Sequence, residues 1–174
     1  MPTRRRRTFS TSAARRRTTW ATVSEVITLA GTGDYQTIDL LANFKADGGV
    51  QQACTIARTH LVLAVEDAPD AGDQFAWGLL RGQNSDVGTN IAGAPTPNED
   101  PYNDWVLWET LSAGVAPGGG AAYWPGSGNV WRYDIKAMRK LEELQMCYNA
   151  VFDNISGTAP LTIGVTGRVL VMLP

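Results

Sequence analysis

The feature that most constrains the fold is a strict alternation of apolar and polar side chains, which is clearest towards the C-terminus. In the segment 161–173, one face would carry Leu161, Ile163, Val165, Val169, Val171 and Leu173. The opposite face would carry Thr162, Thr166 and Arg168. A period of two predicts a β-strand with one face against a core, because successive side chains of a strand point to opposite sides.

The same pattern recurs along the chain. Residues 20–30 predict a strand with Ala21, Val23, Ile27 and Leu29 on its apolar face. Residues 52–66 predict a long strand with Ala57, Leu61, Leu63 and Val65 on one face. Further strands are expected at 74–82, 130–144 and 146–153, with a short strand or helical turn at 105–111. Residues 37–47 instead favour one short helix, built on Leu40, Leu41 and Phe44 and capped by Asp39.

Long segments rich in Gly, Pro and Asn separate these strands, at 83–103 and 114–129. About seven or eight strands with such loops predict an antiparallel β-sandwich rather than alternating strands and helices. Long connections favour a jelly roll over a tight meander. We therefore expect an all-β chain with one jelly-roll domain at 19–174 and a disordered arm at 1–18.

Charge is divided sharply between arm and body. Seven of the 15 Lys and Arg residues precede residue 18: Arg4, Arg5, Arg6, Arg7, Arg15, Arg16 and Arg17. No acid occurs before Glu25, so the body carries the other eight cations against all 17 acids. A concentrated cationic segment on an acidic body predicts a polyanionic partner for the arm alone.

An arginine-rich arm (Arg4–Arg7 and Arg15–Arg17) followed by a strand-rich body (Trp20–Pro174) resembles the coat proteins of small icosahedral viruses. It is most similar to those of small circular single-stranded DNA viruses and satellite-type viruses. The stretches Arg132–Leu144 and Gly167–Pro174 resemble segments of small coat proteins of this kind. The resemblance implies a homomultimeric shell, no catalytic site and an inward-facing arm.

The resemblance and the charge together define the expected partners. Each arm arginine can neutralise one phosphate and release counterions, so the arm is expected to bind nucleic acid without reading its sequence. In a shell of about 60 copies the arms would supply about 420 positive charges. We expect homo-oligomers of 60 or a multiple of 60 copies, with single-stranded DNA favoured over RNA, no membrane partner and a location in the virion. The run Arg4–Arg7 also fits a nuclear import signal, which would place the protein in the host nucleus during assembly.

Other features carry weaker chemistry. The six tryptophans (Trp20, Trp77, Trp105, Trp108, Trp124 and Trp131) suit core filling and subunit interfaces equally, and base stacking less well. The acidic stretches 66–73 and 98–104 offer calcium ligands without EF-hand spacing, so solvated loops are the simpler interpretation. His60 is the only histidine, and neither GxSxG nor a phosphate loop occurs. We expect no catalytic residue, no cofactor and no metal.

Three alternatives remain open. An acid-poor, Arg-rich leader also describes a mitochondrial transit peptide, although this one lacks a leucine stripe. A non-capsid β-barrel protein that binds single-stranded nucleic acid would gather basic and aromatic residues on its folded face. A sugar-binding jelly roll would line a pocket with exposed tryptophans. Cys54 and Cys147 are interpreted as small buried residues, with a disulfide left open.

Overall fold

The computed structural model describes residues 17–46, 54–83, 104–125, 129–136, 139–141, 146–157 and 160–173. Within them lie eleven strands and one short helix. In chain order these are β1 (Thr18–Leu29), β2 (Tyr35–Asp39), α1 (Ala42–Ala46), β3 (Cys54–Val65), β4 (Gln74–Gln83), β5 (Asp104–Ser112), β6 (Gly114–Val115), β7 (Ala122–Tyr123), β8 (Val130–Ile135), β9 (Arg139–Leu141), β10 (Met146–Ser156) and β11 (Leu161–Met172).

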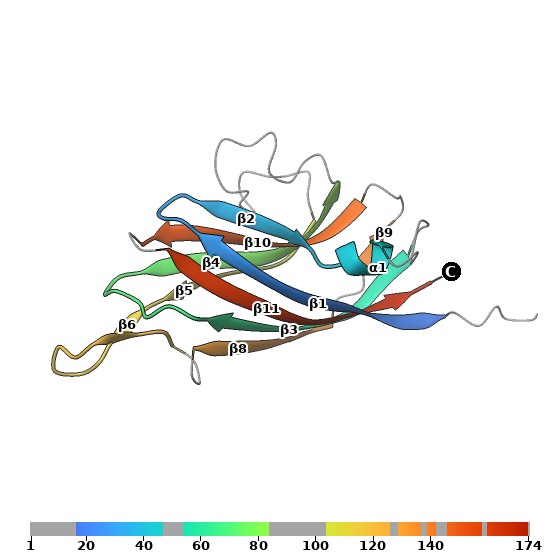
Figure 1. Cartoon of the computed structure of the whole chain (residues 1–174). Coiled ribbons are helices and arrows are strands. Elements are labelled where there is room, and N and C mark those ends of the chain that lie inside the picture. Colours follow the sequence, from blue (N-terminus) through green and yellow to red (C-terminus); the bar gives the residue numbers. More distant parts are fainter. Residues whose placement is uncertain are drawn as a thin grey trace, which may run out of the picture.

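Two antiparallel sheets face one another (Figure 1). The first has the order β1-β11-β3-β8, with β9 also paired to β3, and the second has the order β2-β10-β4-β5. Successive long strands therefore cross from one sheet to the other, except that β4 and β5 are neighbours in the second sheet. This is the strand order of an eight-stranded jelly roll, so the predicted fold class is confirmed.

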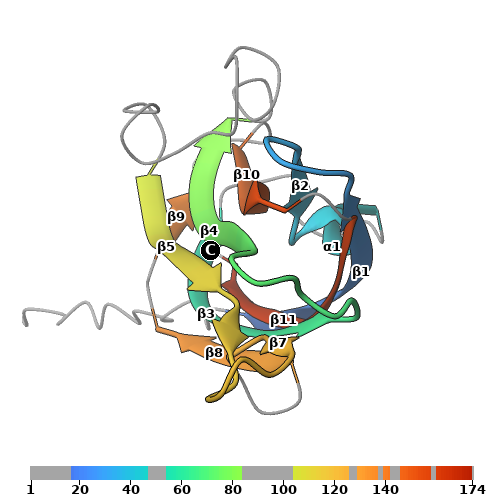
Figure 2. The ribbon, with the colours of Figure 1, turned by 90° about the vertical axis from the view of Figure 1, so that its left-hand side faces the viewer.

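The core lies between the two sheets, which enclose it when the chain is seen end-on (Figure 2). Predicted apolar faces supply it as the alternation indicated: Val23 and Leu29 of β1 and Ile163 and Val169 of β11 are all buried. The second sheet contributes aromatic side chains, including Trp77, Tyr148 and Phe152. Burying side chains of this size is the dominant stabilising contribution to such a domain.

Buried polar groups in this core are paired with one another. The hydroxyls of Thr59 and Tyr148 lie 3.0 Å apart, which joins β3 of one sheet to β10 of the other. The indole Nε1 of Trp77 donates to the hydroxyl of Tyr133 at 3.2 Å, and burial raises the pKa of Tyr133. Since an unpaired buried polar atom costs about 1–3 kcal/mol, these bonds also help to fix the relative position of the sheets.

One predicted core position in β3 is wrong, and the pairing explains why. Leu170 pairs with Arg58, but the next residue of β11, Val171, pairs with Ile56, so Ala57 is an extra residue in a β-bulge. The bulge shifts the alternation by one position. Cys54 and Ile56 therefore enter the core before it, and Leu61, Leu63 and Val65 after it, while Ala57 stays half-buried.

Close packing also explains a glycine in β11. A Cβ atom on Gly167 would lie 2.1 Å from the backbone oxygen of His60 in β3, well inside contact distance. Only glycine lets the two strands approach in this way. This contact matters for the site below, because it fixes Arg168 next to His60 across the sheet.

Two connections contain more structure than their sequence predicted. Residues 37–47 were expected to form one helix, but Tyr35–Asp39 pair with β10 as strand β2, and only Ala42–Ala46 are helical. Asp39 ends β2 and is not the predicted cap, since its Oδ1 accepts a hydrogen bond at 3.0 Å from the backbone N–H of Leu41, which precedes the first helical residue. The expected loop at 114–129 contains the small hairpin β6–β7. Among the described residues, no helix is long and apolar enough to cross a bilayer.

Candidate nucleic-acid interface

The described chain begins where the arginine-rich segment ends. Arg17 is exposed, and its backbone oxygen accepts a hydrogen bond from the N–H of Leu173 at 2.8 Å. From Thr18 onward the chain pairs with β11 as an edge strand of the first sheet, with Thr18 opposite Met172. The other predicted nucleic-acid-binding residues, Arg4, Arg5, Arg6, Arg7, Arg15 and Arg16, lie outside the described residues.

The outer side of this first sheet is positively charged. The outward positions of β11, β3 and β8 and the residue after β8 present four cations, and one acid accompanies them among the described outward residues. We call this surface the basic face, and it consists of Trp20, Arg58, His60, Arg132, Asp134, Lys136 and Arg168. The net charge of the body, −9 by sequence, hides this local excess of cations.

An aromatic ring lies at the β1 edge of the basic face. Trp20 is 39% exposed on β1. The guanidinium carbon of Arg168 lies 4.5 Å from the centroid of the indole ring, which is the geometry of a cation–π contact. The ring of His60 lies 5.5 Å from the indole centroid, tilted by 38°. The three side chains come from three neighbouring strands, so a single register shift would separate them.

The one acid of the basic face continues this chain of contacts to β8. Asp134 accepts two hydrogen bonds from Arg58, at 2.7 Å from Nε and 2.5 Å from Nη2, and its Oδ1 lies 3.5 Å from Nδ1 of His60. The hydrogen bonds from Arg58 lower the pKa of Asp134 to about 2, and the same contact raises the pKa of Arg58. Asp134 therefore remains a carboxylate at any pH near neutrality and holds Arg58 in place.

Acids gather at the other end of the sandwich, in the connections β1–β2 and β3–β4. There several carboxylates accept backbone hydrogen bonds: Asp34 from Ala30, Asp67 from Thr162 and Asp73 from Asp70, at 2.6 to 2.7 Å. These bonds give the predicted acidic loop 66–73 a structural role. Within the described ranges, no three His, Cys, Asp or Glu side chains gather as metal ligands. Residues 98–103 of the second acidic loop lie outside the described residues.

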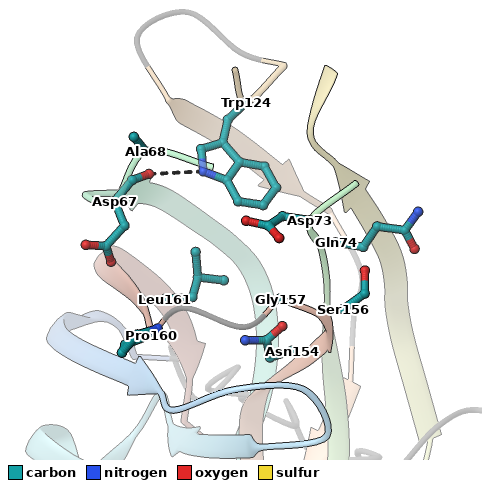
Figure 3. A pocket seen from close by; sticks show the side chains of 10 residues that line it. All are labelled: Asp67, Ala68, Asp73, Gln74, Trp124, Asn154, Ser156, Gly157, Pro160 and Leu161. Carbon is teal, nitrogen blue, oxygen red and sulfur yellow. Dashed lines mark hydrogen bonds between the residues drawn. The ribbon is translucent and has the colours of Figure 1, made fainter. Parts of the chain in front are cut away.

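A small recess lies at the same end (Figure 3). Asp67, Asp73, Trp124, Ser156 and Leu161 are among the residues that line it. Its volume is about 10 Å³, which is about the space of one water molecule. Trp124 is 2% exposed, and its Nε1 donates to the backbone oxygen of Asp67 at 3.2 Å. The recess is therefore too small for a sugar, and its tryptophan has no free ring face to offer.

The tryptophans have three different environments. Trp77 and Trp124 are buried in the core, and Trp131 packs against it. Trp105 and Trp108 of β5 lie on the outer side of the second sheet, half-buried, with ring centroids 5.0 Å apart. We call the area around this pair the tryptophan face. Only Trp20, among the described tryptophans, lies on the basic face.

The single histidine and the two cysteines of the sequence all lie in strands of the two sheets. His60 is a partly exposed strand residue between Trp20 and Asp134, as the interpretation of a satisfied strand histidine predicted. Cys54 is buried at the start of β3 in the first sheet, whereas Cys147 belongs to β10 in the second sheet, and its side chain lies outside the description.

Comparison with known proteins found no matching family model and no significant match among curated proteins. Among solved structures, infectious bursal disease virus VP2 in its subviral particle aligns with a TM-score of 0.41 and 11% identity, over 92% of this chain and 33% of the VP2 chain. The BFDV capsid protein in a 60-mer aligns with a TM-score of 0.39 and 12% identity, over 91% and 93% of the two chains. A chain of Desmodium yellow mottle tymovirus gives 0.39 and 11%, over 91% and 89%.

This chain therefore spans about a third of the length of the infectious bursal disease virus chains that it matches. At TM-scores of 0.39 to 0.41, each of these comparisons records a likeness between two structures and assigns no role to this chain. The assignment of the jelly roll rests on the strand order of the chain itself.

Proposed function

We propose that this chain is the coat protein of a small icosahedral virus, which assembles into a shell of 60 copies or a multiple of 60 and packages nucleic acid through its arginine-rich arm. Jelly rolls serve as capsid subunits, as lectins and as cupins, so the fold alone does not choose among them. The choice rests on what the chain adds to the fold.

The observation that carries the proposal is the junction at Arg17. Seven arginines precede the first strand, and that strand lies at the edge of the sheet with the basic outer face. An extended arm of 16 residues would reach about 55 Å from this junction. Arm and basic face would therefore meet the same polyanion, while the acidic connections β1–β2 and β3–β4 lie at the opposite end of the sandwich.

Sequence-independent binding suits packaging, because a coat protein must hold every part of a genome. Arginines neutralise phosphates whatever the base, and the resulting affinity falls steeply with salt. Single-stranded DNA is the favoured partner and RNA the alternative. The proposed location is the virion, with the run Arg4–Arg7 directing the protein to the host nucleus before assembly.

Size-exclusion chromatography and negative-stain imaging of the purified full chain test the proposal. We expect closed particles of tens of copies that co-purify with nucleic acid and absorb at 260 nm. A monomer or small oligomer across a range of salt and pH would contradict the capsid function.

One second candidate is favoured by a specific observation. The basic face joins cations to an exposed tryptophan, as expected of a non-capsid protein that binds single strands. The same chromatography separates the two functions, since that protein would bind nucleic acid without forming shells.

A further inference from the structure

We propose that the basic face is a second nucleic-acid site, in which Trp20 and Arg168 stack on unpaired bases and so make the folded body selective for single strands. This inference rests on the proposed function and adds to it, because the arm reads phosphates only.

The composition of the face suits a polyanion. Four cations, Arg58, Arg132, Lys136 and Arg168, lie on β3, β8 and β11 or directly after β8, against the single carboxylate of Asp134. That carboxylate is already bound by Arg58 through two hydrogen bonds, so it presents little free negative charge to a ligand. Arg132 and Lys136 are exposed, and neither forms an ion pair with a carboxylate of the described residues. Phosphates approaching this sheet would therefore meet cations on several strands.

The aromatic ring of the face suits a base. Trp20 keeps 39% of its surface open on the outer side of the sheet, where an unpaired base can reach its indole. A planar guanidinium at 4.5 Å adds a second flat group that can stack on bases or clamp a phosphate. Both groups lie on strands that are hydrogen-bonded to each other, with Thr22 opposite Arg168. We call Trp20 and Arg168 together the platform, and it is formed before any ligand arrives.

The position of the arm makes the two sites continuous. Arg17 and Trp20 are three residues apart, on the same edge of the same sheet. A strand of nucleic acid held by the arm would therefore be delivered to the platform. Bases within a duplex are stacked on each other and have no free face for Trp20, whereas unpaired bases have one. The platform consequently discriminates single strands from duplexes, which the arm alone does not do.

A charge-matched pair of ligands tests this inference on the full chain. The probes are an oligomer of 20 thymidines and an abasic deoxyribose-phosphate oligomer of the same length, measured by fluorescence anisotropy on subunits kept below the concentration of shell assembly. Wild-type protein should prefer the thymidine oligomer by about tenfold, since stacking one base on an aromatic ring contributes about 1–3 kcal/mol. Trp20→Leu should remove that preference without changing affinity for the abasic oligomer.

Three further variants control the result. Trp20→Phe retains a ring and should keep most of the preference, and Arg168→Lys retains the charge but should reduce the preference. Tyr123→Leu removes another exposed aromatic, 49% exposed on the hairpin β6–β7, and should change nothing. If the wild type bound both oligomers equally, or if Trp20→Leu weakened both to the same extent, the stacking site would be refuted.

The failure of this inference differs from failure of the proposed function. Shells that form and package nucleic acid while Trp20→Leu keeps the full preference would overturn the stacking site alone. Absence of shells, or absence of binding to either oligomer, would overturn the function on which the site rests.

Discussion

The outer faces of the two sheets have the same architecture but opposite chemistry. On the basic face, Trp20 lies exposed beside a guanidinium and an imidazole. On the tryptophan face, Trp105 and Trp108 lie over the backbone of Gly78, and the neighbouring outward residues Leu80 and Val151 are buried. In the proposed site the tryptophan would serve a polyanion on one side, whereas the same residue type serves apolar packing on the other. The difference comes from the side chains that contact each ring: Arg168 and His60 beside Trp20, and the glycine backbone beneath Trp105 and Trp108.

The largest expected effect comes from removing the arm that serves the basic face. The deletion ends at residue 16, because the backbone oxygen of Arg17 accepts a hydrogen bond from the N–H of Leu173 and so belongs to the folded body. With about seven phosphates neutralised per chain, affinity for single strands should fall about 10³-fold between 50 and 200 mM salt. The deletion should remove most of this salt dependence. Filter binding at four salt concentrations measures it.

The control for that deletion is the fold itself. The far-ultraviolet circular dichroism and the urea midpoint of the truncated chain should match those of the full chain, since β1 begins after the deletion. Unfolding of the truncated body would show that the arm belongs to the folded domain, and would remove the contrast between a phosphate-binding arm and a separate base-binding face.

The second effect tests the tryptophan face. A Cβ atom on Gly78 would lie 2.6 Å from Cε3 of Trp108 and 2.7 Å from Cζ3 of Trp105 and from the backbone oxygen of Leu107. Gly78→Ala should therefore push the indoles away and lower the free energy of unfolding by about 1–3 kcal/mol. Urea denaturation of dispersed subunits measures the loss, and nucleic-acid affinity should stay unchanged.

Gly164 provides the matched glycine on the first sheet. It lies in β11 opposite the exposed Val26, and a Cβ atom there would have its nearest neighbour, the backbone oxygen of Ala64, at 3.7 Å. Gly164→Ala should cost less than about 1 kcal/mol. Equal losses in the two variants would mean that the indoles do not pack on Gly78 in solution.

Much of the fold was predictable, because alternation is a local signal. The apolar faces of β1 and β11 were identified residue by residue, and the long connections indicated a jelly roll. The pattern failed at Ala57, where one extra residue in a bulge shifts the phase, and at Tyr35–Asp39, a short strand whose residues pair only with distant β10. Strand order was beyond the sequence, since pairing joins segments far apart in the chain.

The candidate site was predictable only in part, for the same reason. Seven arginines in the first 17 residues are visible to a reader of the sequence. The basic face is not, because Trp20, His60, Asp134 and Arg168 are separated by up to 148 positions in number and meet only through sheet register. The negative net charge of the whole body gave no indication of a basic surface on it. The one signal available in the sequence was the presence of cations at the outward positions of several predicted strands.

A smaller effect should follow from changing the single acid of the basic face. Asp134→Asn removes a negative charge and releases Arg58 from its ion pair. The slope of log affinity against log salt should steepen by about 0.7 for single strands, which is roughly a threefold change between 50 and 200 mM salt. Asp153→Asn, on β10 of the other sheet, removes the same charge and should leave the slope unchanged.

The smallest effect is the acid stability of the same pair. The pKa of Asp134 is lowered from 3.8 to about 2 by the hydrogen bonds from Arg58, so the folded state binds its proton less readily than the unfolded state. The pair therefore stabilises the fold above pH 4, and this contribution is lost as the pH falls through 2. The difference in urea midpoint between wild type and Asp134→Asn should be constant from pH 7 to 4 and shrink towards pH 2.

Because Asp134 and Arg58 are both partly exposed, with 43% and 38% of their side-chain surface open, solvent screening keeps this difference small. A midpoint difference that persisted unchanged at pH 2 would mean that Asp134 contributes through packing or hydrogen bonds that do not depend on its charge. The charge of Asp134 would then contribute nothing measurable to stability, and its effect on the basic face would be limited to the charge balance that the salt dependence of Asp134→Asn measures.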